Sequence, residues 1–206
     1  MQGYAKINLR DMPKAMDEER LNCTLAEFSC PYNKDVEDFL HVKAREFSKQ
    51  QLATTYLIFA SYRGEQVLVG YFTLSIKYFH IDLKRPGRVS SKLRRRIGKF
   101  AKYDDDLKKS VVSALLIAQL GKNYSSGHDQ LITGDELLKI ACDTVMAVQR
   151  MASGKIVYLE CEDTPSLIKF YERNGFTSFG IRELDGDETS KFKGKHLVQM
   201  LKYLGD

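Results

Sequence analysis

The sequence predicts an α/β protein built on a mixed β-sheet, and three features of the chain support this prediction. Short apolar runs rich in β-branched residues alternate with amphipathic segments of helical period. Two strand-then-helix units, beginning at residues 111 and 156, are expected to place their strands parallel in the sheet. Residues 55–79 are expected to form an antiparallel hairpin, so the sheet contains both strand directions.

The predicted elements before the middle of the chain follow from hydrophobic period and turn residues. Residues 10–34 are polar and carry no clear pattern. The apolar stripe at 35–51 predicts a helix, with the stem of Lys43 lying along its apolar face. The strands predicted in this half are a weak one at 4–9 and two at 55–62 and 67–79, joined by a turn at 63–65.

The composition is that of a globular protein with one domain covering residues 1–206. Of its 206 residues, 43% are hydrophobic and 29% charged. No apolar run approaches the ~20 residues of a membrane span, and the N-terminus lacks the apolar core of a signal peptide. The four cysteines form no C-x-x-C pair and lack further ligands at metal-site spacing. We therefore expect a cytoplasmic protein with free thiols, no bound metal and no membrane partner.

The positive charge is concentrated in a basic insert at about residues 81–110. This segment holds 11 Lys or Arg against 4 Asp, while the whole chain has a net charge of +5. Within it, Arg94, Arg95 and Arg96 lie beside the apolar stripe of a predicted short helix, which the acidic run at 104–106 is expected to end. A solvated surface helix is the favoured interpretation, and a nucleic-acid-binding patch is the alternative.

The stretch from residue 111 to residue 152 organises the chain. A buried strand is predicted at 111–120, followed by a polar loop at 121–132. Thr133 and Glu136 form a capping box that opens a helix ending at about residue 152. The helix N-terminus favours an anion, although Asp135 and Glu136 would compete with a phosphate there. An ordinary strand-to-helix connection explains the same residues, so both interpretations stay open.

The C-terminal part continues the alternation of strands and helices. A strand is predicted at 156–162, and Thr164 is placed as the N-cap of a short helix with Pro165 at its first position. Gly175 ends this helix, and two strands follow at 176–184 and 197–204.

Four segments stand out as a group: Leu116–Gly121, Thr133–Leu138, Tyr158–Glu160 and Phe170–Phe176. The last is the most specific, with an aromatic residue, a tyrosine, three residues and then Gly-Phe on a short helix after a strand. Together they resemble the GCN5-related N-acetyltransferase (GNAT) superfamily. The resemblance covers roughly residues 55–204 and implies a GNAT-like central mixed, mostly antiparallel sheet with a splayed parallel strand pair, flanked by helices.

The resemblance also implies acetyl-CoA as cosubstrate and assigns residues to it by position. In the family's phosphate-loop motif only Gly134 matches here, so Ser126 or Gly127 is an alternative contact. Thr164 stands where the family often has a CoA-contacting asparagine. By position, the residues expected to line the pantetheine arm are Leu120, Gly121 and Lys122. The residues expected to offer backbone amides to the pyrophosphate are Thr133, Gly134 and Asp135.

Two residues are candidates for the chemistry. Tyr171 falls where the family often places the acid that protonates the departing thiolate, and a packed helix aromatic is the alternative. Glu160 is the candidate base for the attacking amine, with Glu162 as a fallback and a surface carboxylate as the alternative.

The expected function is acetyl-CoA-dependent N-acetylation of a primary amine on a small molecule or protein. One alternative is a toxin-like acetyltransferase that acts on aminoacyl-tRNA through the basic insert. Another is a non-catalytic CoA-binding module. A nucleic-acid partner through Arg94, Arg95 and Arg96 and a homodimer both remain open.

Overall fold

The computed structural model describes residues 3–14, 16–84, 87–186 and 194–205. The chain divides into two compact units. Unit 1 comprises residues 1–75 and 117–141, and unit 2 comprises residues 76–116 and 142–206. Two strands and one helix have residues in both units, and each unit is described by itself.

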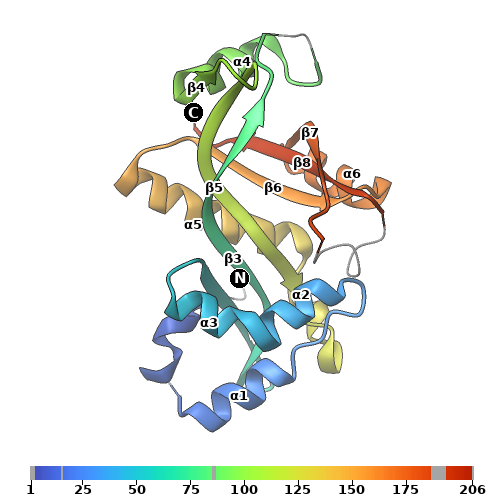
Figure 1. Ribbon diagram of the computed structural model, residues 1–206. Coiled ribbons are helices and arrows are strands. Elements are labelled where there is room, and N and C mark those ends of the chain that lie inside the picture. The colour runs from blue at the N-terminus through green and yellow to red at the C-terminus, as the bar shows by residue number, and fades with distance from the viewer. Residues whose placement is uncertain (1–2, 15, 85–86, 187–193, 206) are drawn as a thin grey trace. The chain divides into compact units, whose positions relative to one another are not determined.

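Unit 1 begins with β1 and ends in the first turns of α5 (Figure 1). β1 pairs antiparallel with β2, and β2 pairs antiparallel with β3. The elements are β1 (Ala5–Asn8), a 3-10 turn (Leu9–Lys14), α1 (Glu18–Ala26), α2 (Lys34–Asp38), a π-helical turn (Phe39–Lys43), α3 (Ala44–Lys49), β2 (Thr54–Tyr62), the first part of β3 (Glu65–Ile81), the last part of β5 (Lys109–Lys122), a 3-10 segment (Ser125–Leu131) and the start of α5 (Gly134–Ala152).

The predicted β2–β3 hairpin is confirmed. The backbone of its turn has the conformation that a two-residue hairpin turn requires. Arg63 and Gly64 have φ angles of 52° and 84°. Two successive positive φ angles match the twist of a two-residue hairpin turn. The ladder closes with Tyr62 opposite Glu65.

The helix predicted at 35–51 is present as α2, the π-helical turn and α3, which together span residues 34–49. The π-helical turn takes one more residue per hydrogen-bonded ring than an α-helical turn, and so rotates the following residues about the axis. Lys43 is consequently exposed, and the prediction that its stem lies along the apolar face is wrong. The core under this helix contains the fully buried Tyr71, whose ring meets that of Phe28 edge-on at 5.1 Å.

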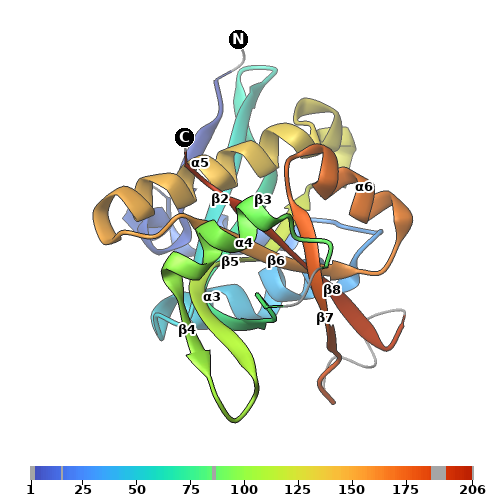
Figure 2. The same cartoon turned by 90° about the horizontal axis from the view of Figure 1, so that it is seen from above.

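Unit 2 contains the remaining strands, and Figure 2 shows α6 beside β7. β6 pairs with β8 along its whole length, from Ile156 opposite Tyr203 to Glu162 opposite Leu197. Its core includes Phe79, Ile97 and Tyr158. The elements are the rest of β3, α4 (Ser91–Ile97), a 3-10 turn (Gly98–Phe100), β4 (Ala101–Asp104), the first part of β5, the rest of α5, β6 (Ile156–Glu162), α6 (Pro165–Arg173), β7 (Thr177–Glu183) and β8 (His196–Tyr203).

The strand order confirms a mixed, mostly antiparallel sheet. It runs β1-β2-β3-β5-β6-β8-β7, with β4 paired to β5 outside this path. β5 and β6 are parallel, with Leu115 opposite Val157, as the two strand–helix units predicted. The pairs β1–β2, β2–β3, β4–β5, β6–β8 and β7–β8 are antiparallel.

The acidic run at 104–106 has a different place from the one predicted. α4 ends at Ile97, and the acidic run begins at the last residue of β4 and continues into the turn before β5. There Asp104 Oδ1 accepts hydrogen bonds from the amides of Asp106 and Leu107 at 3.0 and 2.9 Å. An aspartate that binds the amides two and three residues ahead favours a turn, and this explains why the run closes a hairpin. Within the described residues, no helix is long and apolar enough to cross a bilayer.

Candidate functional site

The end of β5 is held in place by the close packing of α2. A Cβ atom on Gly121 would collide with the side chain of Val36 and lie 3.4 Å from Phe28. On the neighbouring strand, a Cβ atom on Gly70 would lie 2.8 Å from the Gly121 carbonyl oxygen. Gly121 is therefore required for close packing in unit 1. Its place along a pantetheine arm stays a prediction.

Asn123, directly after β5, was not singled out from the sequence and is a centre of hydrogen bonding. Its amide and its Nδ2 group donate to the carbonyls of Val69 and Leu68, each at 2.9 Å. Its Oδ1 accepts from the amides of Ser29 and Ser125, each at 3.0 Å. The buried side chain thus fixes where the strand ends and the loop begins.

Lys122 closes the loop that follows. Its ammonium donates to the carbonyls of Asp129 and Ile132 at 2.8 and 3.2 Å. The predicted loop is mostly a 3-10 segment, in which Ser126 and Gly127 have φ angles of 52° and 76°. The side chain of Lys122 therefore shapes the segment that leads to α5.

The capping box at the start of α5 is confirmed. The Glu136 carboxylate accepts from the Thr133 amide at 2.8 Å and from the Thr133 hydroxyl at 2.7 Å. The Glu136 amide donates back to the Thr133 hydroxyl oxygen at 3.1 Å. The bonds from the hydroxyl and then the amide of Thr133 lower the pKa of Glu136. Gly134 and Asp135 follow as the first residues of the helix.

Tyr4, just before β1, reaches this capping box. Its hydroxyl donates to the Leu131 carbonyl at 3.1 Å. Burial and the nearby charge of Glu136 raise the pKa of Tyr4. The start of the chain therefore contacts the segment that opens α5.

In unit 2, Glu160 on β6 is held by two partners. Its Oε2 atom lies 2.8 Å from Arg182 Nε on β7, and its Oε1 atom accepts from Gln199 Nε2 on β8 at 2.9 Å. Both carboxylate oxygens are thus engaged with hydrogen-bond donors. A proton acceptor here must compete with the Arg182 ion pair.

Tyr171 on α6 is buried among aromatic rings. Its ring centre lies 4.9 Å from that of Phe170 and 5.8 Å from that of Phe176. Burial raises the pKa of Tyr171 well above its ordinary value, so the phenol keeps its proton at neutral pH. Burial also raises the pKa of the nearby Cys161 thiol to about 12. The packing and the proton-donor interpretations are compatible for this residue.

Thr164 occupies the predicted N-cap position of α6 but does not use its side chain there. Its backbone is extended, with φ −118° and ψ 133°, and its hydroxyl makes no capping hydrogen bond. Pro165 follows at the start of the helix, where its missing amide costs nothing. The Thr164 amide donates to the carbonyl of Glu162, the fallback base, at 2.7 Å.

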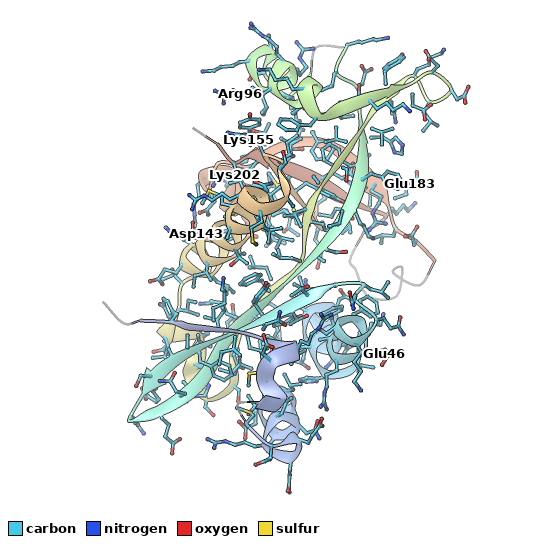
Figure 3. The ribbon with its side chains drawn as sticks, turned by 90° about the vertical axis from the view of Figure 1, so that its left-hand side faces the viewer. Glu46, Arg96, Asp143, Lys155, Glu183 and Lys202 are labelled. Atoms are coloured by element: carbon cyan, nitrogen blue, oxygen red, sulfur yellow. The ribbon has the colours of Figure 1, made fainter. Side chains whose placement is uncertain are left out.

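The three arginines of the basic insert differ in their surroundings. Arg95 is exposed, whereas Arg94 is half-buried. Arg96, labelled in Figure 3, places its guanidinium carbon 5.0 Å from the centre of the Tyr203 ring. The exposed basic side chains of the insert are Lys84, Arg88, Lys92, Arg95, Lys99, Lys102, Lys108 and Lys109.

A cavity of about 370 Å³ opens on the same insert. Lys84 Nζ lies 3.5 Å from the centre of the Tyr103 ring, which lines the cavity. In the described part of the chain, no three His, Cys, Asp or Glu side chains are grouped to hold a metal ion. The cavity lining is Phe100, Lys102, Tyr103, Asp104, Val111 and Ser113.

Comparison with known proteins gives matches among solved structures. Neither family models nor curated proteins match the chain. A structure described as a bacterial toxin is 16% identical over 99% of this chain and 92% of its own, with a TM-score of 0.63. A tyrosine-to-phenylalanine variant of KacT is 15% identical over 96% and 94%, with a TM-score of 0.58. AtaT complexed with acetyl-methionyl-tRNAfMet is 16% identical over 95% and 94%, also with a TM-score of 0.58.

At these identities the likeness concerns the fold, and it extends over nearly the whole of each chain. KacT and AtaT have the GNAT fold. The mostly antiparallel sheet with its parallel β5–β6 pair matches this fold. The chain therefore has the fold of the GCN5-related N-acetyltransferase superfamily.

Proposed function

We propose that this protein is an acetyl-CoA-dependent acetyltransferase whose acceptor is the amino group of an aminoacyl-tRNA. The observation that carries the proposal is the fold likeness to AtaT, which is described in complex with acetyl-methionyl-tRNAfMet and, in another structure, with acetyl-CoA. The sequence favoured a small-molecule or protein amine as acceptor. The likeness supports the aminoacyl-tRNA alternative better, because AtaT is described with acetyl-methionyl-tRNAfMet and its match covers 95% of this chain.

The start of α5 fits the anionic pyrophosphate of acetyl-CoA in part. A helix of this length carries a partial positive charge at its first turn. Gly134 adds no side chain there, and the half-exposed Leu120 and Lys122 precede it on β5. Asp135 and Glu136 oppose the anion by their charge. The residues therefore fit the group, with an electrostatic penalty.

The mechanism we propose is direct attack of the amine on the thioester that bound acetyl-CoA supplies. The new bond joins the amine nitrogen to the acetyl carbon, the carbon–sulfur bond breaks, and the amine proton leaves to solvent or a base. Tyr171, a neutral phenol at neutral pH, donates its proton to the departing sulfur and regains a proton from solvent.

The surroundings of Glu160 also support an α-amino acceptor. Because Arg182 and Gln199 hold both carboxylate oxygens, Glu160 is a restrained base. α-Amino groups titrate near pH 8 and lysine side chains near 10.4, so an α-amine needs far less help to become neutral. An α-amino acceptor therefore suits a site in which the candidate base, Glu160, is already paired with Arg182.

The basic insert supplies the charge that an RNA acceptor needs. Among the residues that the structure describes, eight exposed Lys or Arg side chains lie between positions 84 and 109. Such side chains bind phosphates by releasing counterions, which makes the affinity fall steeply with salt. The aromatic side chains of Phe100 and Tyr103 line the cavity on the same segment.

The test is acetyl transfer from labelled acetyl-CoA to competing acceptors. Charged tRNA, uncharged tRNA, free amino acids and a lysine-rich protein are offered together, and each product is identified by mass spectrometry. We expect the acetyl group on the α-nitrogen of the amino acid recovered from charged tRNA. Transfer to the free amine or the protein alone would overturn the proposed acceptor, and no transfer at all would overturn the activity.

A further inference from the structure

The first turn of α5 already has a negatively charged side chain bound at its N-terminus, the carboxylate of Glu136. The carboxylate of Glu136 accepts hydrogen bonds from both donors of Thr133, the amide at 2.8 Å and the hydroxyl at 2.7 Å. These are donors of the kind that a phosphate oxygen takes at a helix N-terminus. A donor engaged with the carboxylate cannot at the same time serve a phosphate oxygen.

We propose that Glu136 competes with the pyrophosphate of acetyl-CoA for Thr133 and thereby weakens acetyl-CoA binding. The inference rests on the proposed function, since it assumes acetyl-CoA as the ligand at this helix start. Glu136 is thus a residue that sets the affinity for the cosubstrate. Binding exchanges one anion for another, and the hydrogen bonds lost by Glu136 offset part of those gained by the phosphate.

Two neighbouring side chains, Tyr4 and Lys122, are bonded to backbone carbonyls of the preceding loop. Tyr4 lies close enough for the charge of Glu136 to raise the pKa of its phenol, and it is anchored to the Leu131 carbonyl at 3.1 Å. Lys122, a cation of the same loop, is bound to the carbonyls of Asp129 and Ile132. Its ammonium is therefore committed to shaping the loop, while the carboxylate is paired with Thr133.

The chain also offers a control for simple charge repulsion. Asp135 is the adjacent residue in the same first turn, so its replacement removes an equal charge from nearly the same place. If Glu136 acts through occupancy of Thr133, its removal must have a larger effect than the removal of Asp135. If only net charge matters, the two replacements must have equal effects.

The experiment is calorimetric titration of the full chain with acetyl-CoA. Glu136→Ala removes both charge and acceptor, and we expect the Kd to fall by about 3- to 10-fold, the range of one lost competing hydrogen bond and helix-terminus charge. Glu136→Gln keeps an acceptor and the capping geometry, so its Kd should fall less. Asp135→Asn should give the smallest change.

Acetyl-pantetheine, which lacks the pyrophosphate, is the second probe, and its affinity should be the same in all four proteins. An unchanged or raised Kd for acetyl-CoA in both Glu136 variants, with melting temperatures that show folded protein, would overturn the competition. Equal gains in Glu136→Ala and Asp135→Asn would overturn it as well. A wild-type chain that gives no heat with acetyl-CoA would instead overturn the proposed function, and the inference with it.

Discussion

At the scale of single residues, burial and partners decide which chemistry each side chain can perform. Tyr171 is surrounded by Phe170 and Phe176, so it stays a neutral phenol across the physiological range. Glu160 is paired with Arg182 and stays engaged as an acceptor. The proposed donor therefore carries its proton, while the proposed acceptor is already engaged by Arg182.

Replacing Tyr171 by phenylalanine tests the donor directly. We expect kcat to fall by ~10²–10⁴-fold, the usual contribution of a general acid, with the Kd for acetyl-CoA nearly unchanged. The measurement is steady-state kinetics together with calorimetry. Tyr56→Phe is the control. It removes a hydroxyl from a β2 ring whose centre lies 5.2 Å from that of Phe72, and it should leave kcat unchanged. An unaltered kcat in Tyr171→Phe would mean that Tyr171 only packs.

The sequence predicted single residues well where the signal is local. The capping box of Thr133 and Glu136 spans four residues and appears as predicted. The partnership of Glu160 and Arg182 joins residues 22 apart and depends on a register shift in β7 between Ser178 and Gly180. A bulge of this kind changes which face a side chain occupies, and no local pattern announces it.

At the scale of elements, the predicted strands and the long helix lie within a few residues of the observed ones, but β4 was not predicted. Strong period and turn residues account for the hairpin at Arg63 and Gly64. The π-helical turn at 39–43 was missed, because sequence period does not distinguish one extra residue in a turn. The place of the acidic run was also missed, since the same aspartates suit a helix end and a hairpin turn.

The packing of α2 on β5 gives a prediction at this scale. Gly121→Ala forces a Cβ atom against Val36, and overpacking of this kind costs about 1–3 kcal/mol of unfolding free energy. Urea denaturation followed by circular dichroism measures the loss. Gly87→Ala is the matched control, because its Cβ atom meets nothing within 4 Å, and its stability should change by less than about 0.5 kcal/mol. Equal stability of the two variants would show that α2 yields without cost.

At the scale of the whole molecule, the charge is the most uneven property of the chain. The basic insert holds 11 of the 32 Lys and Arg residues, in about a seventh of the length. In the structure some of these basic side chains are exposed and others are partly buried, a difference that the sequence did not predict. Arg96 packs on Tyr203, while Arg95 and Lys99 face solvent.

This division selects the side chains that should bind RNA. Changing Lys92, Arg95 and Lys99 together to serine should weaken tRNA binding and reduce the slope of log K against log salt by about 0.9 for each lost phosphate contact. Filter binding over a range of salt concentrations measures both. The same three-charge change at the exposed Lys43, Lys49 and Arg150, which lie outside the insert, is the control. Identical slopes in the two triple variants would place the RNA elsewhere.

The self-capped start of α5 has a consequence for the end of a catalytic cycle. In the reaction we propose, free CoA remains after the transfer and carries the same pyrophosphate as acetyl-CoA, so it competes with Glu136 for the same donors of Thr133. Glu136 stands beside those donors and can take them back as the product loosens. A carboxylate that weakens acetyl-CoA binding therefore also weakens the binding of free CoA. We expect CoA to dissociate rapidly from this protein after the transfer.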